Sequence, residues 1–354
     1  MSGGVDSSVT AAILLERGYS VVGLTMKLWE YDAVGGNLYS ESSCCSLEGI
    51  HDAARVADQL GIPHYVVDVH EAFEKQVIRN FIEEYRRGRT PNPCVLCNVL
   101  TKWDLLRLKG KALGAKYFAT GHYARVRFNP ATRRYELLRA QDKGKDQSYA
   151  LWALRQEQLA DTLLPLGDLT KDATRKLAER LGLRTASKPD SQEICFVPDN
   201  DYRRFLHERG EPERVGEIVD TEGNVLGHHR GYTGFTIGQR RGLGIAVGRP
   251  VYVVDIDPVR NRVVVGDRDE LLSRGLVASG VNWVALPGLE EPVRAWVKIR
   301  YRDRGSWATL HPGEEPGTVR VEFDEPQPAV TPGQSAVFYD GDRVLGGGFI
   351  LKRL

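Results

Sequence analysis

The sequence predicts an α/β protein in which a parallel sheet covered by helices is followed by two small β domains, the last of them a β-barrel. Three observations lead to this prediction. A loop rich in glycine and serine opens the chain and runs into a helical pattern, and apolar runs then alternate with helical stretches up to about residue 204. From Gly216 onward, short Val-rich runs separated by glycine turns replace the helices. We place domain boundaries near residues 205 and 272, which gives segments 1–205, 206–272 and 273–354.

The expected elements of the first segment follow from the periodicity of its apolar residues. A helical pattern follows the opening loop, with apolar positions at Val9, Ala12, Ile13 and Leu15. Strands are expected at 21–24, 64–69 and 117–120, and helices at 51–60, 73–85 and 103–113. Beyond Gly216, strands are expected at 251–256 and 263–265, between turns such as those at Gly223, Asn261 and Gly341. The alternation of strand and helix in the first segment favours parallel strands.

The opening loop has the composition of a phosphate-binding site. Adjacent Gly3 and Gly4 allow backbone N–H groups to approach an anion, the helix start directs its positive end there, and Asp6 can serve a metal or the loop itself. No lysine follows the glycines, so the loop differs from the commoner phosphate-binding loop and suits pyrophosphate better than a transferable terminal phosphate. The alternative is an ordinary turn that caps the helix.

The start of the chain departs from what such a loop requires. A buried strand is expected to precede the loop and to orient its glycines, but only Met1 stands before Ser2. We therefore expect that the chain starts at an internal methionine or has lost this strand. We also expect that an added upstream apolar segment raises the melting temperature.

Composition narrows the class of protein. The chain has 354 residues and a formal net charge of +1, so nucleic acid has to be met by local basic patches and not by a global field. No apolar run is long enough to span a membrane and no secretion signal opens the chain, which makes a cytoplasmic location the default. In that compartment, the five cysteines are expected to be reactive or metal-binding thiols.

Three cysteines lie where chemistry is expected. Cys94 and Cys97 follow two prolines, which are expected to hold a loop that presents the thiols, and Cys195 lies about a hundred residues later. A Cys-x-x-Cys pair indicates a redox pair, a metal site or a nucleophile with a helper. No second pair of ligands completes a structural zinc site. Cys44 and Cys45 are expected in a loop that leads into a helix.

Seven motifs in order carry a family resemblance. They lie at residues 2–8, 23–29, 91–98, 119–125, 145–149, 194–196 and 234–240. Together they resemble the bacterial tRNA-specific 2-thiouridylases, which belong to the PP-loop ATP pyrophosphatases. The resemblance implies an adenine nucleotide α-hydrolase-like PP-loop domain, a central β domain and a C-terminal β-barrel. It also implies a sulfurtransferase that uses ATP to make 2-thiouridine, with AMP and pyrophosphate, at the wobble position of lysine, glutamate and glutamine tRNAs.

The resemblance assigns residues to the nucleotide and to sulfur. The nucleotide would be bound by Ser2, Gly3, Gly4, Val5, Asp6, Ser7 and Ser8 of the loop, which hold its phosphates, with Met26 beside the adenine and Gly121 at the nucleotide. A magnesium ion would offset the phosphate charge. Adenylation of the C2 oxygen would make that carbonyl electrophilic. Cys195 would carry the persulfide whose sulfur attacks C2, and Cys97 would release the sulfur through a transient disulfide with Cys195. We also hypothesise that Arg86, Arg87 or Arg89 lowers the pKa of Cys97.

Cys94 leaves a second route to sulfur open. Many family members have aspartate at this position, and here three thiols, Cys94, Cys97 and Cys195, offer the ligands of a 4Fe–4S cluster with one iron free to bind sulfide. The alternative for Cys94 is a small buried residue. The sulfur donor, a cysteine desulfurase or a sulfur-relay protein, is not identified by the sequence.

The resemblance also assigns tRNA contacts. Asn92, Pro93 and Cys94 would lie at the flipped target base, and the other contact positions would be His122, Lys145, Asp146, Gln147, Arg300, Tyr301 and Gln334. His122 has the alternative of a satisfied core histidine. Clusters of cations at 228–232, 239–249, 125–139 and 300–302 indicate RNA-contacting surfaces or, alternatively, solvated basic faces.

Two rival functions remain from the sequence. A PP-loop amidotransferase or synthetase would use an amine as nucleophile and would need neither the cysteine pair nor the basic β domains. A tRNA-binding module with a decayed ATP site would keep tRNA affinity without turning ATP into AMP.

Overall fold

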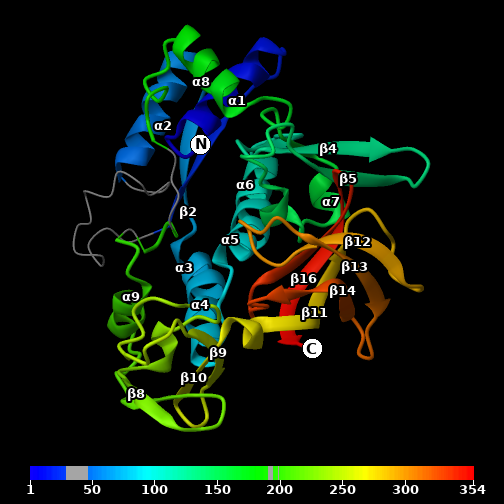
Figure 1. The fold of residues 1–354 in the computed structure, drawn as a ribbon. Coiled ribbons are helices and arrows are strands. Elements are labelled where there is room, and N and C mark those ends of the chain that lie inside the picture. Colours follow the sequence, from blue (N-terminus) through cyan, green and yellow to red (C-terminus); the bar gives the residue numbers. More distant parts are fainter. Residues whose placement is uncertain (29–46, 190–193, 198) are drawn as a thin grey trace. The chain divides into compact units, whose positions relative to one another are not determined.

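The chain forms two compact units in the computed structural model, which describes residues 1–28, 47–189, 194–197 and 199–354 (Figure 1). Unit 1 comprises residues 1–77, 94–200 and 342–344, and unit 2 comprises residues 78–93, 201–341 and 345–354. The predicted boundaries near 205 and 272 therefore stay a prediction. Trp29, Cys44 and Cys45 lie outside the described residues.

Unit 1 carries the alternation of helices and strands expected from the sequence. Its elements are α1 (Val5–Glu16), β1 (Gly23–Lys27), α2 (Leu47–Leu60), β2 (His64–Asp68), α3 (His70–Phe73), α5 (Pro93–Leu96), α6 (Arg107–Ala112), β3 (Phe118–Ala119), β4 (Ala124–Asn129), β5 (Arg134–Arg139), α7 (Gln156–Leu159), β6 (Thr162–Leu163) and α8 (Lys171–Arg180). Short helical segments at Glu74–Ile78, Cys97–Leu106 and Ser148–Leu151 complete it. The predicted helix 73–85 is built from three consecutive pieces, of which the last, α4 (Arg79–Arg86), belongs to unit 2.

Four strands of unit 1 pair in parallel, as predicted, whereas β4 and β5 pair with each other antiparallel. β1 pairs with β2 from Gly23↔His64 to Lys27↔Asp68, and β3 pairs with β6. Among the described strands these are two separate two-stranded sheets. Tyr65 and Val66 of β2 are 50% and 48% exposed. The expectation of a sheet covered on both faces is therefore wrong for β2, although the α/β class is confirmed.

Helix α1 packs into a buried cluster of unit 1. Its residues Val5, Val9 and Ile13 are buried together with Val56 of α2 and Ala178 of α8. A helix that is buried on most of its surface is held by packing and does not depend on an amphipathic stripe. The position of the loop that precedes α1 is consequently fixed by the core.

The residue that precedes the loop contacts β1. The amino group of Met1 bonds to the carbonyl oxygen of Leu24, and the hydroxyl of Thr25 donates to the carbonyl oxygen of Met1 at 2.7 Å. These contacts anchor the start of the described chain on strand β1. The expected effect of an added upstream segment on the melting temperature stays a prediction.

Unit 2 is mostly β structure. Besides α4 it contains α9 (Tyr202–Glu208), β7 (Gly216–Val219), β8 (Val225–His229), β9 (Tyr252–Asp257), β10 (Arg262–Gly266), β11 (Leu272–Trp283), β12 (Val293–Lys298), β13 (Ser306–Pro312), β14 (Val319–Pro328), β15 (Ser335–Asp340) and β16 (Arg343–Arg353), the start of which belongs to unit 1. The small sheet has the order β8-β7-β10-β9 and buries Ile218, Val253 and Val263.

The remaining strands of unit 2 form a closed barrel. Their order is β11-β14-β13-β12-β15-β16, and β11 also pairs with β16, which closes the ring. On β14, Val319, Val321 and Phe323 point into the core while Arg320 and Glu322 alternate with them on the exposed face. This confirms the predicted C-terminal β-barrel. Within the described part of the chain, none of the helices has the length and apolar character needed to cross a membrane.

Candidate active site

The phosphate loop, residues 2–8, lies at the N-terminus of α1. Gly3 has a φ of +69°, and a Cβ on it would lie 2.2 Å from the carbonyl oxygen of Gly49, so glycine is required. Among the described residues no side chain caps the helix start at Gly4. The first N–H groups of α1, together with the positive end of the helix dipole, are thus suited to an anion.

The serines of the phosphate loop stabilise its shape. The hydroxyls of Ser7 and Ser8 donate to the carbonyl oxygen of Gly4 at 3.1 and 2.9 Å, and the backbone N–H of Ser2 donates to Ser7 Oγ at 3.1 Å. In this structure both serine side chains bond within the loop. Because the hydroxyl hydrogens of Ser7 and Ser8 are used within the loop, these two residues present their backbone to a ligand.

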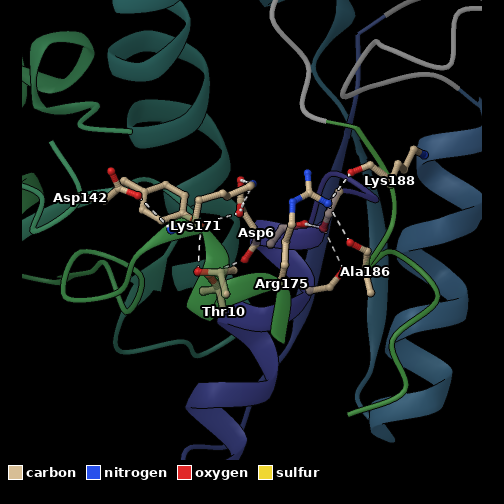
Figure 2. A network of polar contacts seen from close by, with 12 residues as sticks. Asp6, Thr10, Asp142, Lys171, Arg175, Ala186 and Lys188 are labelled. Carbon is tan, nitrogen blue, oxygen red and sulfur yellow. Dashed lines mark hydrogen bonds and ion pairs between the residues drawn. The ribbon is translucent and has the colours of Figure 1, made fainter. Parts of the chain in front are cut away.

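The carboxylate of Asp6 is held by two residues from distant parts of unit 1. Nζ of Lys171 donates to its two oxygens at 2.7 and 2.9 Å (Figure 2). The hydroxyl of Tyr123 donates to Oδ1 at 2.9 Å. The Lys171 side chain is only 9% exposed and that of Asp6 is 33% exposed. Of the two roles expected for Asp6, these contacts favour the loop over a metal, because an ammonium group already neutralises both oxygens.

Gly121 lies directly against the phosphate loop. A Cβ on Gly121 would lie 2.8 Å from the carbonyl carbon of Asp6 and 3.0 Å from its Cβ. The predicted position of Gly121 at the nucleotide agrees with this close approach. Met26, expected beside the adenine, is buried on β1, opposite Val67 in the register.

Cys94 and Cys97 lie on a helix and not on the predicted loop. Pro93 is the first residue of α5, where its missing N–H costs nothing, and the helical path continues through Cys97. The three-residue spacing places the two thiols on one helical face. Cys94 is exposed and Cys97 is half-buried.

Cys195 is also half-buried, and helix α8 contacts the described chain up to Lys188. The guanidinium of Arg175 donates to the carbonyl oxygens of Ala186 and Lys188 at 2.8 and 3.2 Å (Figure 2). Nζ of Lys188 in turn lies 2.7 Å from Asp52 of α2. Immediately after Cys195, the buried ring of Phe196 packs on Phe73. The segment that ends at Lys188 and the residue that follows the thiol are therefore each anchored to helices of unit 1.

The predicted tRNA-contacting loop, residues 145–147, is joined to Tyr123. Oε1 of Gln147 accepts from the N–H of Tyr123 at 2.9 Å, and the N–H of Gln147 donates to the carbonyl oxygen of Tyr123 at 2.8 Å. The carboxylate of Asp146 accepts from the N–H groups of Ala140 and Ser148. Asp146 thus fixes the shape of the loop that also carries Lys145.

His122 is buried, which favours its alternative interpretation as a core histidine. Its Nδ1 lies 2.8 Å from the hydroxyl of Thr120, and its ring packs against Trp103. Burial, and to a lesser extent the charge of Lys102, hold the pKa of His122 well below its usual range. A neutral, buried ring is poorly suited to contact a phosphate.

The predicted tRNA positions of unit 2 have different surroundings. Nε2 of Gln334 donates to the carbonyl oxygens of Thr90 and Pro91 at 3.0 and 3.1 Å, directly before Asn92 and Pro93. Tyr301 is 46% exposed in the turn after β12 and Arg300 is half-buried. Gln334 therefore positions the segment that precedes the thiols, whereas Tyr301 is accessible to a large partner.

Several cations of the predicted basic clusters are already paired. Arg127 lies 2.6 Å from the buried carboxylate of Glu136, and Arg125 lies 2.9 Å from Asp342. His229 is buried, and burial lowers its pKa. For these positions the structural interpretation is favoured over an RNA-contacting surface.

The arginines proposed to activate Cys97 also have carboxylate partners. Arg86 pairs with Glu211, and Arg87 and Arg89 lie 3.2 and 3.9 Å from Glu84. Their positive charges are offset locally, which weakens the hypothesis that they lower the pKa of Cys97.

Comparison with known proteins places this site in a family. Residues 1–199 match a family model described as the tRNA methyl transferase HUP domain, residues 203–267 match its PRC-barrel domain, and residues 273–350 match the aminomethyltransferase β-barrel domain. A protein of Heliobacterium modesticaldum named tRNA-specific 2-thiouridylase MnmA is 52% identical over 100% of this chain and 92% of its own. A protein of the same name from Geobacter metallireducens is 54% identical over 99% of this chain and 95% of its own.

This chain belongs to the tRNA-specific 2-thiouridylase family. The result confirms the resemblance carried by the seven motifs and the predicted class of enzyme. Among solved structures, the U34-tRNA thiolase NcsA of Methanococcus maripaludis, which contains a 4Fe–4S cluster, matches at 19% identity and a TM-score of 0.35, over 59% of this chain and 64% of that one. That likeness is too distant to support an argument about the site of this 2-thiouridylase family member.

Two residues of the site were missed from the sequence. Tyr123 lies inside the motif 119–125 but had no role assigned, and Lys171 was not singled out. One signal for Lys171 exists: a lysine in the first turn of a helix opposes the helix dipole, which indicates a local anionic partner. Its partner, Asp6, is 165 positions away in the chain, and only the fold reveals it.

The iron–sulfur route requires Cys94, Cys97 and Cys195 to act together as ligands. Among the described residues, no group of three or more His, Cys, Asp or Glu side chains is arranged to hold a metal ion. The iron–sulfur cluster held by Cys94, Cys97 and Cys195 therefore stays a prediction, and the mechanism proposed for this chain uses the persulfide route.

Proposed function

We propose that this chain transfers sulfur to C2 of the wobble uridine of tRNA in an ATP-dependent reaction. The observation that carries the proposal is the phosphate loop: Gly3 in a left-handed conformation, an uncapped α1 start among the described residues, and Gly121 packed against the loop. A family of 2-thiouridylases that matches over the whole length supplies the reaction class.

The residues present fit a bound ATP. Backbone N–H groups of residues 3–8 would hold its phosphates, with Met26 and Gly121 at the nucleoside, and the excess negative charge would be offset by Mg²⁺. ATP, when bound, supplies the AMP group that is attached to the C2 oxygen of the uridine and makes that oxygen a leaving group. The chain's own contribution at this point is orientation, since the loop is fixed by the buried helix α1 and by the contacts of Asp6.

The thiols divide the sulfur transfer between them. Cys195 would bear the persulfide, whose terminal sulfur forms a bond to C2 while the bond from C2 to the oxygen of AMP breaks. The thiolate of Cys97 would then attack Sγ of Cys195, which leaves the terminal sulfur on the base and forms a disulfide between the two cysteines. Two electrons from a dithiol reductant restore both thiols. The half-burial of both thiols supports this assignment, because it protects a persulfide while leaving it accessible.

The partners follow from this chemistry. We propose the lysine, glutamate and glutamine tRNAs as substrates and a cysteine desulfurase or sulfur-relay protein as donor, in the cytoplasm. Asn92, Pro93 and Cys94 would lie at the target base. Lys145, Arg300 and Tyr301 would contact the rest of the tRNA, and the exposure of Tyr301 supports its role.

The test is thiolation of an unmodified lysine tRNA transcript. Anaerobically purified protein is assayed with ATP, Mg²⁺ and either a persulfide donor or sulfide, as isolated and after iron reconstitution, and the nucleosides are separated by chromatography and mass spectrometry. We expect iron-independent thiouridine with the persulfide donor. Activity only after reconstitution would overturn the persulfide route, and the absence of thiouridine under every condition would overturn the thiolation itself.

Three matched variants separate the routes further. Cys97→Ser and Cys195→Ser are expected to abolish turnover, whereas Cys94→Ser is expected to retain it within about tenfold, because Cys94 carries no sulfur in the persulfide route. Equal loss in all three would support a cluster. Retained tRNA affinity without conversion of ATP to AMP in the unmodified chain would instead favour a binding module, and an amine product would favour the amidotransferase.

A further inference from the structure

We propose that Tyr123, Lys171 and Asp142 are positioning residues that couple the loop 142–147 to the phosphate loop, so that ATP and tRNA each raise the affinity for the other. This inference rests on the proposed function, since residues 145–147 are tRNA contacts only there. The network lies wholly in unit 1 and has two branches that both end at Asp6.

The first branch runs through Tyr123. Two hydrogen bonds join Gln147 to the backbone of Tyr123. The side-chain oxygen of Gln147 accepts from the N–H of Tyr123, and the N–H of Gln147 donates to the carbonyl oxygen of Tyr123. The hydroxyl of the same tyrosine donates to Asp6 and lies 3.0 Å from Thr174 Oγ1 of α8. The ring between these two ends is buried. A buried ring fixed at both ends transmits a displacement of residue 147 to the carboxylate of Asp6.

The second branch runs through Lys171. Its backbone N–H donates to Oδ2 of Asp142 at 3.0 Å, and the N–H of Gly144 donates to Oδ1 of the same carboxylate at 3.0 Å. Figure 2 shows Lys171 between Asp142 and Asp6, with its ammonium on Asp6. Nζ of Lys171 also lies 5.7 Å from the centre of the Tyr123 ring, so the two branches contact each other.

The two branches link ligand binding at the phosphate loop to the free-energy cost of ordering the loop 142–147. A ligand on the phosphate loop fixes Asp6 and, through both branches, the loop 142–147. A second ligand on that loop then pays less of the ordering cost, which is positive cooperativity between two distinct sites. Thermodynamic linkage requires the effect to be equal in both directions.

The first experiment uses hydrogen exchange and a non-hydrolysable ATP analogue, without tRNA. The N–H of Tyr123 donates to Gln147 and the N–H of Gln147 donates to Tyr123, so the exchange rates of these two N–H groups report on the first branch directly. We expect the analogue to slow exchange in residues 121–125 and 145–149 of the unmodified chain. Tyr123→Phe, which keeps the ring and removes the hydroxyl, is expected to reduce the effect at 145–149, because only the branch through Lys171 and Asp142 remains. Tyr117→Phe, a partly exposed tyrosine of the same unit, serves as the matched control.

The second experiment measures the coupling itself. The dissociation constant of the analogue is determined with and without saturating unmodified lysine tRNA. We expect tRNA to tighten it about fivefold or more in the unmodified chain, with the same factor for tRNA on adding the analogue. Tyr123→Phe and Asp142→Ala should each reduce this factor and the double variant should remove it, while Asp168→Ala, an exposed carboxylate of unit 1, should not change it.

The outcomes separate the two proposals. Failure to thiolate tRNA, with the exchange effect present, would overturn the proposed function and leave the coupling of the two loops intact. Two results would overturn the coupling in a chain that thiolates tRNA. In the first, the ATP analogue and tRNA do not change each other's dissociation constant. In the second, the double variant shows the same factor as the unmodified chain. If the double variant does not fold, the exchange data on Tyr123→Phe decide, because that variant retains the buried ring.

Discussion

Gln334 and Pro91 are joined by a hydrogen bond in which Nε2 of the glutamine donates to the carbonyl oxygen of Pro91 at 3.1 Å. The same nitrogen donates to Thr90 at 3.0 Å, and the N–H of Thr90 donates to the carbonyl oxygen of Pro332 at 2.9 Å. Gly333, which lies between Pro332 and Gln334, has a φ of +91°, and a Cβ on it would lie 2.7 Å from the carbonyl oxygen of Thr90. The segment 332–334, next to strand β15 of the barrel, thus holds the backbone directly before Asn92.

Gln334→Leu is expected to lower the rate of thiolation about tenfold while leaving ATP affinity unchanged. Leucine removes both hydrogen bonds, each worth about 1 kcal/mol, and releases the segment that precedes Asn92 and Pro93. Single-turnover thiolation and binding of the ATP analogue measure the two quantities. Gln327→Leu is the matched control, because among the described residues the Gln327 amide bonds to the nearby carbonyl oxygen of Glu325. An unchanged rate with weakened tRNA binding would show that Gln334 contacts tRNA directly.

Gly121→Ala is expected to weaken ATP binding about tenfold or more without weakening tRNA binding. The added Cβ would lie 2.8 Å from the backbone of Asp6, so the phosphate loop has to move. Overpacking of this kind costs about 1–3 kcal/mol. Titration with the ATP analogue checks the prediction. Gly288→Ala, where a Cβ meets open space, should leave both affinities intact. Tight ATP binding by Gly121→Ala would place the nucleotide elsewhere.

His122→Asn is expected to reduce the acid sensitivity of the fold. Burial holds the pKa of His122 well below its usual range, so the folded chain keeps the ring neutral while the unfolded chain protonates it below about pH 6.5. The stability that the neutral ring provides is present above that pH and is lost as the pH falls towards the folded pKa, by about 1.4 kcal/mol per pH unit. Denaturant unfolding of both proteins between pH 7 and 5 measures this slope.

The same variant tests the two interpretations of His122. A core histidine predicts that the tRNA affinity of folded His122→Asn equals that of the unmodified chain. A clear loss of affinity, with the slope of stability against pH unchanged, would instead support a direct tRNA contact.

Arg300→Ala is expected to weaken tRNA binding uniformly across substrate tRNAs and to reduce the salt dependence of binding by a slope of about 1. This follows if the residue neutralises one phosphate beside the exposed Tyr301. Binding titrations at several salt concentrations measure it. Arg294→Ala is a suitable comparison, because Arg294 is an exposed barrel arginine paired with Asp324. Equal effects of the two substitutions would indicate a general loss of positive charge and no specific contact.

Local signals in the chain were sufficient to predict much of the fold. Periodicity gave the helices around residues 51–60 and 73–85, and β-branched runs gave the strands of both units, because these patterns depend on neighbours within one or two turns. The helix at Cys94 was predicted as a loop because two prolines dominated the pattern, although Pro93 at the first helical position is compatible with a helix. The exposure of Tyr65 and Val66 was not foreseen, since β-branched and aromatic composition does not reveal which face of a strand is covered.

The sequence by itself determined the family, the order of the motifs, the phosphate loop at a helix start and the class of reaction. These are properties of short segments whose residue types are dictated by local backbone conformation and by chemistry. The tertiary structure decided which side chains orient that loop. Lys171 reaches Asp6 across 165 positions and Tyr123 across 117, and Gln334 reaches Thr90 across 244. Such pairs are formed by the packing of a core, which brings distant segments together and leaves no periodic mark in the sequence.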